Sequence, residues 1–114
     1  MENLEMIKKV AILAAKTAGA HAAAECGKIK EISTKQNFRD IVTNVDRECE
    51  AIAMQIINDE FPGHSVLAEE SGGERSKKGF LWVIDPIDGT INFAHSFPFY
   101  CTSIGVLLDG KACV

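Results

Sequence analysis

Two carboxylates, a glycine and a hydroxyl group stand close together in the segment W-V-I-D-P-I-D-G-T-I-N-F, from Trp82 to Phe93. Asp85 and Asp88 offer hard oxygen atoms, which Mg²⁺ prefers as ligands. Gly89 lets a backbone N–H group approach a ligand closely, and Thr90 adds a hydroxyl group and a possible helix N-cap. Two acids beside free N–H groups are typical of a site for a metal ion and a phosphate.

An apolar run precedes these residues and must position them. Residues 81–84 are rich in aromatic and β-branched side chains, which predicts a strand buried on both faces. Pro86 cannot donate a hydrogen bond to a sheet, so we expect the strand to end at Asp85 and Asp88 to lie in the following turn. Both carboxylates would then face one small volume. The pattern D-P-x-D-G is also good turn chemistry, so a loop that only shapes the chain is the alternative interpretation.

A second pair of acids follows another short apolar run. Residues 65–68 predict a strand that ends at Glu69, Glu70 and Ser71. Neighbouring strands that deliver acids to the same edge of a sheet converge on one site. We therefore expect Glu69 to lie near Asp85, with Glu70 as a supporting or solvated acid.

Two helices are predicted before these strands. Residues 3–26 repeat apolar side chains with a helical period, and the alanine-rich second half suits close packing in the core or, alternatively, against a partner helix. The second helix begins after Thr43, has Asp46 where a capping box requires an acid, and ends at Phe61. Capping is therefore an alternative role for Asp46. The two predicted apolar stripes are Leu4, Ile7, Ala11, Ala14, Ala18 and Ala22, and then Val45, Cys49, Ile52 and Ile56.

The remaining segments predict strands and loops. Residues 29–42 alternate weakly and then become polar, which indicates a short strand or extended arm followed by a loop. Residues 100–108 predict a long strand, and Asp109 with Gly110 is a hairpin signal. Residues 111–114 are too few for a full returning strand.

Composition limits the possible classes of function. The chain has 114 residues, of which 46% are hydrophobic and 25% are charged, and predicts one globular unit. A net charge of −4 argues against nucleic-acid or membrane partners, and an anionic substrate would need help from a metal ion. Four cysteines without metal-ligand spacing predict free thiols in a reducing compartment. With no export signal or apolar span, we expect a cytoplasmic protein.

The segment from Trp82 to Phe93, with F-P-F at residues 97–99 and S-I-G at residues 103–105, resembles the signature of the inositol monophosphatase family of Mg²⁺-dependent phosphatases. D-I-V-T-N-V-D at residues 40–46 and A-E-E-S at residues 68–71 resemble two further motifs of that family, in the same order. The resemblance implies an α+β fold, a layered αβ sandwich like that of fructose-1,6-bisphosphatase. This chain would be its amino-terminal, metal- and phosphate-binding half, and we also expect a homodimer.

The resemblance also implies roles for individual residues. The implied metal ligands, for Mg²⁺ as cofactor, are Glu69, Asp85, Asp88 and the main-chain carbonyl group of Ile87. The implied catalytic residues are Asp46, Glu69 and Thr90. The implied substrate-binding residues are Ile87, Asp88, Gly89 and Thr90. Asp46 and Thr90 would orient the attacking water, and Lys35 matches a loop lysine near the metals.

The implied reaction is hydrolysis of a small-molecule phosphate monoester, with inositol monophosphate as the first choice. Fructose 1,6-bisphosphate and 3′-phosphoadenosine 5′-phosphate are alternative substrates. A phosphotransferase with Asp85 as covalent nucleophile fits less well, because such enzymes usually place the second acid two residues later. A non-catalytic cation-binding fragment is a further alternative, because residues 1–114 resemble only the amino-terminal part of the family and lack a later metal-ligating Asp. We therefore expect the chain alone to be weakly active or inactive.

Overall fold

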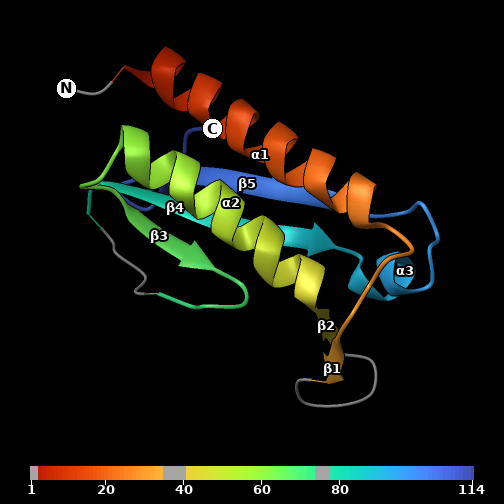
Figure 1. Ribbon diagram of the computed structural model, residues 1–114. Coiled ribbons are helices and arrows are strands. Elements are labelled where there is room, and N and C mark those ends of the chain that lie inside the picture. Colours follow the sequence, from red (N-terminus) through yellow and green to blue (C-terminus); the bar gives the residue numbers. More distant parts are fainter. Residues whose placement is uncertain (1–2, 35–40, 74–77) are drawn as a thin grey trace.

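Two long helices pack over one face of a four-stranded sheet, and a short hairpin and a short helix lie at one end (Figure 1). The computed structural model describes residues 3–34, 41–73 and 78–114. The helices are α1 (Leu4–Glu25), α2 (Asn44–Glu60) and α3 (Thr90–Ala94). The strands are β1 (Ile32–Thr34), β2 (Ile41–Thr43), β3 (Ser65–Ala68), β4 (Phe80–Asp88), β5 (Cys101–Leu108) and β6 (Lys111–Ala112). The predicted layered αβ arrangement is confirmed.

The sheet is mixed, with the order β3-β4-β5-β6. Strand β3 runs parallel to β4, whereas β4 with β5 and β5 with β6 are antiparallel. Asp109 and Gly110 have φ angles of 51° and 86°, as the predicted β5–β6 hairpin turn requires. Strands β1 and β2 form a separate antiparallel pair. The described helices include none with the length and apolar composition needed to cross a bilayer.

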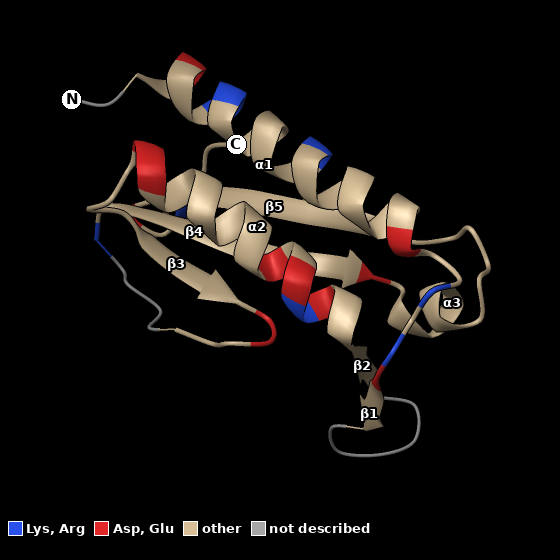
Figure 2. Cartoon of the chain, viewed as in Figure 1, with Lys and Arg blue, Asp and Glu red and all other residues tan. Residues whose placement is uncertain are grey.

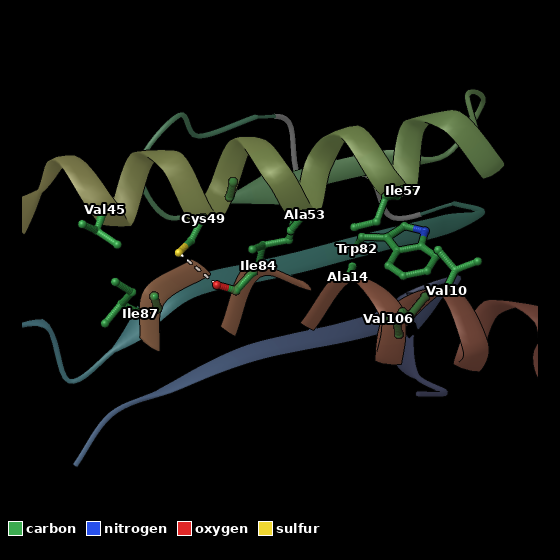
Figure 3. Close-up of a cluster of buried hydrophobic side chains, with 14 of the residues drawn as sticks. Val10, Ala14, Val45, Cys49, Ala53, Ile57, Trp82, Ile84, Ile87 and Val106 are labelled. Carbon is green, nitrogen blue, oxygen red and sulfur yellow. Dashed lines mark hydrogen bonds between the residues drawn. The ribbon is translucent and has the colours of Figure 1, made fainter. Parts of the chain in front are cut away.

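Helix α1 buries an alanine-rich stripe that lets α2 approach closely. The predicted stripe is confirmed except at Leu4, which is 48% exposed because it lies in the first turn, outside the helix contact. The Cys49 thiol of α2 donates a hydrogen bond to the carbonyl oxygen of Ala18 at 3.2 Å, which is possible only because the alanine side chains are small (Figure 3). The four cysteines are free thiols.

Helix α2 begins with the predicted capping box. The Thr43 hydroxyl oxygen accepts a hydrogen bond from the Asp46 N–H group at 3.2 Å, and Asp46 Oδ2 accepts one from the Thr43 N–H group at 2.9 Å. The predicted apolar stripe is displaced in the second half of the helix. Ala53, rather than Ile52, faces the core, and Ile57 is likewise buried (Figure 3). Ile52 and Ile56 are half-buried at the edge of this face, because a face that contacts both α1 and the sheet is wide.

Strand β4 is longer than predicted, and the prediction that it ends at Asp85 is wrong. It stays paired with β5 as far as Asp88, with a register shift between Asp85 and Asp88. Pro86 and Ile87 together oppose Thr102, which makes a β-bulge. The bulge accommodates a proline because the ladder is interrupted there, and the Thr102 hydroxyl group donates to the Pro86 carbonyl oxygen at 2.9 Å. The two acids therefore flank a bulge instead of a strand end.

The core lies between the helices and the sheet (Figure 3). Trp82 of β4 is fully buried, and its indole N–H group donates to His64 Nδ1 at 3.0 Å. Ile87, in the bulge, is only 2% exposed, so its side chain anchors the end of β4 in the core. This anchoring holds in place the acids on either side of it.

Candidate active site

A cavity of about 450 Å³ opens where β4 ends and α3 begins. The residues that line it are Ile41, Glu69, Asp85, Ile87, Asp88, Gly89, Thr90, Ile91 and Asn92. Every residue predicted from the sequence as a metal ligand or phosphate contact is among them. The acids come from the end of β4 and from the turn after β3, and others lie on the first half of α2 (Figure 2). Lys35 lies outside the described residues.

The register of the parallel strands brings Glu69 beside Asp85. Ala68 pairs with Ile84, so the next residue of each strand is an acid at the same edge. The Glu69 N–H group continues this pairing by donating to the Ile84 carbonyl oxygen at 3.1 Å. The expected convergence of the two acids on one site is thus observed in the fold.

Asp85 is held in surroundings that disfavour its negative charge. Its Oδ1 atom is buried and is, within the described part of the chain, the one buried side-chain nitrogen or oxygen atom without a hydrogen-bond partner. Burial is the main cause that raises the pKa of Asp85 to about 7, followed by a hydrogen bond with Glu69 and the charges of Glu69, Asp88 and Asp46. Mutual repulsion and an orphaned oxygen atom are both relieved by a bound cation, so these residues fit a metal ion.

Side-chain ligands alone do not form a closed metal cage. In residues 3–34, 41–73 and 78–114, no three His, Cys, Asp or Glu side chains are grouped as a metal site. Mg²⁺ does not require such a group, because it usually keeps several waters and uses one or two carboxylates. Glu69 and Asp85, with the carbonyl oxygen of Ile87, offer an oxygen set of that kind.

Thr90 connects the cavity to the N-terminus of α2. Its hydroxyl oxygen lies 2.8 Å from Asp46 Oδ1 and 3.0 Å from the Ile87 carbonyl oxygen. The hydroxyl group has a single proton to donate to these two acceptors. Asp46 is 1% exposed, and its Oδ2 atom accepts hydrogen bonds from both the N–H and the hydroxyl group of Thr43. Asp46 therefore caps the helix with one oxygen atom and contacts Thr90 with the other.

Gly89 makes the sharp turn between β4 and α3. Its φ angle is 96°, in the left-handed region that side chains disfavour. A Cβ atom at this position would lie 2.8 Å from the carbonyl oxygen of Phe99. The turn therefore requires glycine, and it brings the first turn of α3 to the cavity wall.

Sequence reasoning missed four residues in or near the site. Ile41, Ile91 and Asn92 line the cavity, and the Asn92 amide group donates to the Phe99 carbonyl oxygen at 2.9 Å, which ties α3 to the following loop. Glu50 is 4% exposed and contacts the turn that carries Glu69. Its signal in the sequence was an acid four residues after Asp46, on the buried face of α2.

The layered αβ fold brings acids from two adjacent strands to one cavity, an arrangement that suits a bound cation. The chain matches the inositol monophosphatase family over residues 3–114 and belongs to that family. It is 44% identical over 108 residues to the inositol-1-monophosphatase of Synechocystis sp., covering 94% of this chain and 38% of that protein. It is 39% identical over 113 residues to the inositol-1-monophosphatase of Bacillus subtilis, covering 97% and 43%.

A solved structure confirms the predicted fold. The extragenic suppressor protein suhB from Bartonella henselae superposes with a TM-score of 0.87 at 30% identity, covering 94% of this chain and 42% of that one. The chain spans about two fifths of the length of the relatives it matches, 38% and 43% in the two named above.

Proposed function

We propose that this chain carries the metal- and phosphate-binding part of an enzyme that hydrolyses a phosphate monoester with Mg²⁺, and that the ester is inositol monophosphate. One observation carries the proposal: the buried, unpartnered Oδ1 atom of Asp85, surrounded by Glu69, Asp88 and Asp46. Family membership supports a phosphatase, and the names of the two bacterial relatives support the inositol ester.

Mg²⁺ held by Glu69, Asp85 and the Ile87 carbonyl group, and a second ion at Asp85 and Asp88, would offset phosphate charge and make water more acidic. Thr43 holds the Oδ2 atom of Asp46, which keeps its Oδ1 atom directed at Thr90. This Oδ1 atom accepts the Thr90 hydroxyl proton, which leaves the Thr90 oxygen lone pairs to accept a hydrogen bond from water in the cavity.

The reaction that follows is a simple displacement at phosphorus. Water oriented by Thr90 forms a new P–O bond while the ester P–O bond breaks, and the leaving alkoxide takes a proton from solvent water to become the alcohol. Asp46 Oδ1 is placed to take up the proton that the water loses, through the Thr90 hydroxyl group. The N–H groups of Gly89 and Thr90, at the start of α3, would receive the phosphate oxygens.

The covalent alternative is less well supported. A phospho-aspartyl enzyme needs its nucleophilic oxygen exposed to phosphorus. The Oδ1 atom of Asp85 is buried, and the carboxyl group shares a hydrogen bond with Glu69. These surroundings suit a cation ligand better than a nucleophile.

The test compares phosphate release by the complete enzyme of which this chain is proposed to be part, at millimolar Mg²⁺, from three esters: inositol 1-phosphate, fructose 1,6-bisphosphate and 3′-phosphoadenosine 5′-phosphate. We expect the inositol ester to have the highest kcat/KM, and chelation of the metal to stop the reaction. Release that persists in excess EDTA would contradict the proposal, and a preference for another ester would correct the substrate.

A further inference from the structure

We propose that Glu50 is a positioning residue: its buried carboxylate clamps the turn that carries Glu69 and thereby sets the affinity of the site for Mg²⁺. The inference rests on the proposed function in one respect, namely that Glu69 is a metal ligand. Glu50 does not line the cavity, so any effect it has on the metal must pass through the turn.

The carboxylate of Glu50 uses both oxygen atoms on the backbone of this turn. Oε1 accepts a hydrogen bond from the Glu70 N–H group at 2.8 Å, and Oε2 accepts one from the Ser71 N–H group at 3.0 Å. Glu50 is 4% exposed, so water does not compete strongly for these hydrogen bonds. Hydrogen bonds from backbone N–H groups to a carboxylate are stronger than those to a neutral acceptor.

The turn depends on Glu50 because the backbone supplies acceptors only at its two ends. Ala68 and Gly72 donate to each other's carbonyl oxygen atoms at 2.9 and 2.8 Å, and Glu69 donates to Ile84 of β4 at 3.1 Å. The N–H groups of Glu70 and Ser71, which lie in between, donate hydrogen bonds to Glu50. Five successive N–H groups are thus satisfied, and the backbone that leads into and out of Glu69 is fixed at every position.

Helix α2 consequently positions two walls of the cavity. Asp46 and Glu50 stand one helical turn apart, so both project from the same buried face. Asp46 reaches Thr90, and Glu50 reaches the Glu69 turn. A single rigid element therefore sets the separation between the water-orienting side and the metal-binding side.

The variant Glu50→Gln separates the clamp from general packing, because it keeps the size of the side chain. Its amide group can accept one backbone N–H group but presents its own donor to the other. Glu48→Gln is the matched control, since Glu48 lies on the same helix, is exposed, and bonds to Asn44 and His21 away from the turn. Glu50→Asp, which keeps the charge but shortens the side chain, replaces the first variant if that one does not fold.

The first measurement is amide hydrogen exchange in the metal-free protein, followed by NMR. We expect the Glu70 and Ser71 amides to exchange about tenfold faster or more in Glu50→Gln, while amides of β4 and β5 keep their protection. Glu48→Gln should leave all of these rates unchanged. Unchanged exchange at Glu70 and Ser71 in Glu50→Gln would overturn the clamp itself, whatever the protein catalyses.

The second measurement is calorimetric titration with Mg²⁺ alone, well below the unfolding temperature. We expect the Kd to rise about tenfold in Glu50→Gln, as for loss of a residue that orients a metal ligand, and to stay constant in Glu48→Gln. Glu69→Gln serves as the reference and should remove most of the binding. If Glu69→Gln binds Mg²⁺ normally, the proposed function has the wrong ligand. If Glu69→Gln fails to bind but Glu50→Gln binds as tightly as the parent protein, only the positioning role of Glu50 is overturned.

Discussion

The two walls of the cavity differ in how completely their carboxylates are hydrogen bonded. On one wall, Thr90 lines the cavity, and Asp46 behind it accepts hydrogen bonds on both oxygen atoms, from Thr43 and from Thr90. On the other wall, Asp85 has a buried oxygen atom without a donor, and its pKa is raised to about 7. The protein alone completes the first wall, whereas the second needs a positive charge from a ligand.

The difference follows from the local backbone. Asp46 stands in the first turn of a helix, where free N–H groups and a capping threonine provide donors. Asp85 is followed by Pro86, which has no N–H group, in a bulge where ladder hydrogen bonds are interrupted. The acids Glu69, Asp88 and Asp46 raise the pKa of Asp85 further through the repulsion of their charges.

The largest expected effect on Mg²⁺ affinity comes from replacing Asp85, the carboxylate with an unsatisfied oxygen atom. Asp85→Asn should weaken Mg²⁺ binding by at least about 100-fold, more than a supporting residue would, because Asp85 is proposed to contact both ions. Glu70→Gln is the control and should change the Kd far less. Calorimetry measures both, and equal Kd values for the two variants would show that Asp85 is not the central ligand.

The side of the cavity formed by Thr90 and Asp46 is tested by removing the Thr90 hydroxyl group. In the complete enzyme, Thr90→Ala should lower kcat about 100-fold and leave KM nearly constant, because a group that orients water acts mainly in the transition state. Thr90→Ser keeps the hydroxyl group and should retain most of the activity. Steady-state kinetics on the inositol ester decide the matter, and an unchanged kcat in Thr90→Ala would reduce Thr90 to a helix-terminal residue.

A smaller effect, on stability, is expected when Asp46 loses the hydrogen bond from the Thr43 hydroxyl group. Thr43→Ala removes the hydroxyl group of the capping box but keeps the backbone N–H group that holds Asp46. The expected loss of unfolding free energy is about 1 kcal/mol, measured by denaturant titration. Thr43→Ser should behave like the parent protein. A loss as large in the serine variant would assign the effect to the missing methyl group.

Much of the site could be predicted because its parts are local in sequence. Asp85, Asp88, Gly89 and Thr90 lie within six residues, so one bulge and one glycine turn bring them together. The position of Glu69 followed from a rule about sheets, that acids at the same end of adjacent strands converge.

Features that depend on tertiary contacts were not predictable in the same way. The bulge in β4 requires a partner strand that begins after residue 100. The exposure of Leu4 and the displaced stripe of α2 depend on the direction from which each helix meets its neighbours. Glu50 is the clearest case, because its role is defined by the N–H groups of Glu70 and Ser71, which lie about twenty residues later in the chain.

The central claim is that a bound cation satisfies the buried carboxylate of Asp85. The pKa of Asp85 tests this claim directly. Its pKa is raised from 3.8 to about 7 without metal, so the folded protein holds a proton that the unfolded chain releases earlier. Metal-free stability should therefore fall as the pH rises from about 4 through 7, and then level off. Bound Mg²⁺ should remove this loss, because it favours the ionised carboxylate.

The most direct measurement is an NMR titration of the carboxyl carbon of Asp85, with and without saturating Mg²⁺. The account predicts a midpoint near 7 in the metal-free protein, where burial and Glu69 raise the pKa. With Mg²⁺ the midpoint should fall below the ordinary aspartate value of about 4. A midpoint that is the same with and without Mg²⁺ would contradict the claim that a cation completes this wall.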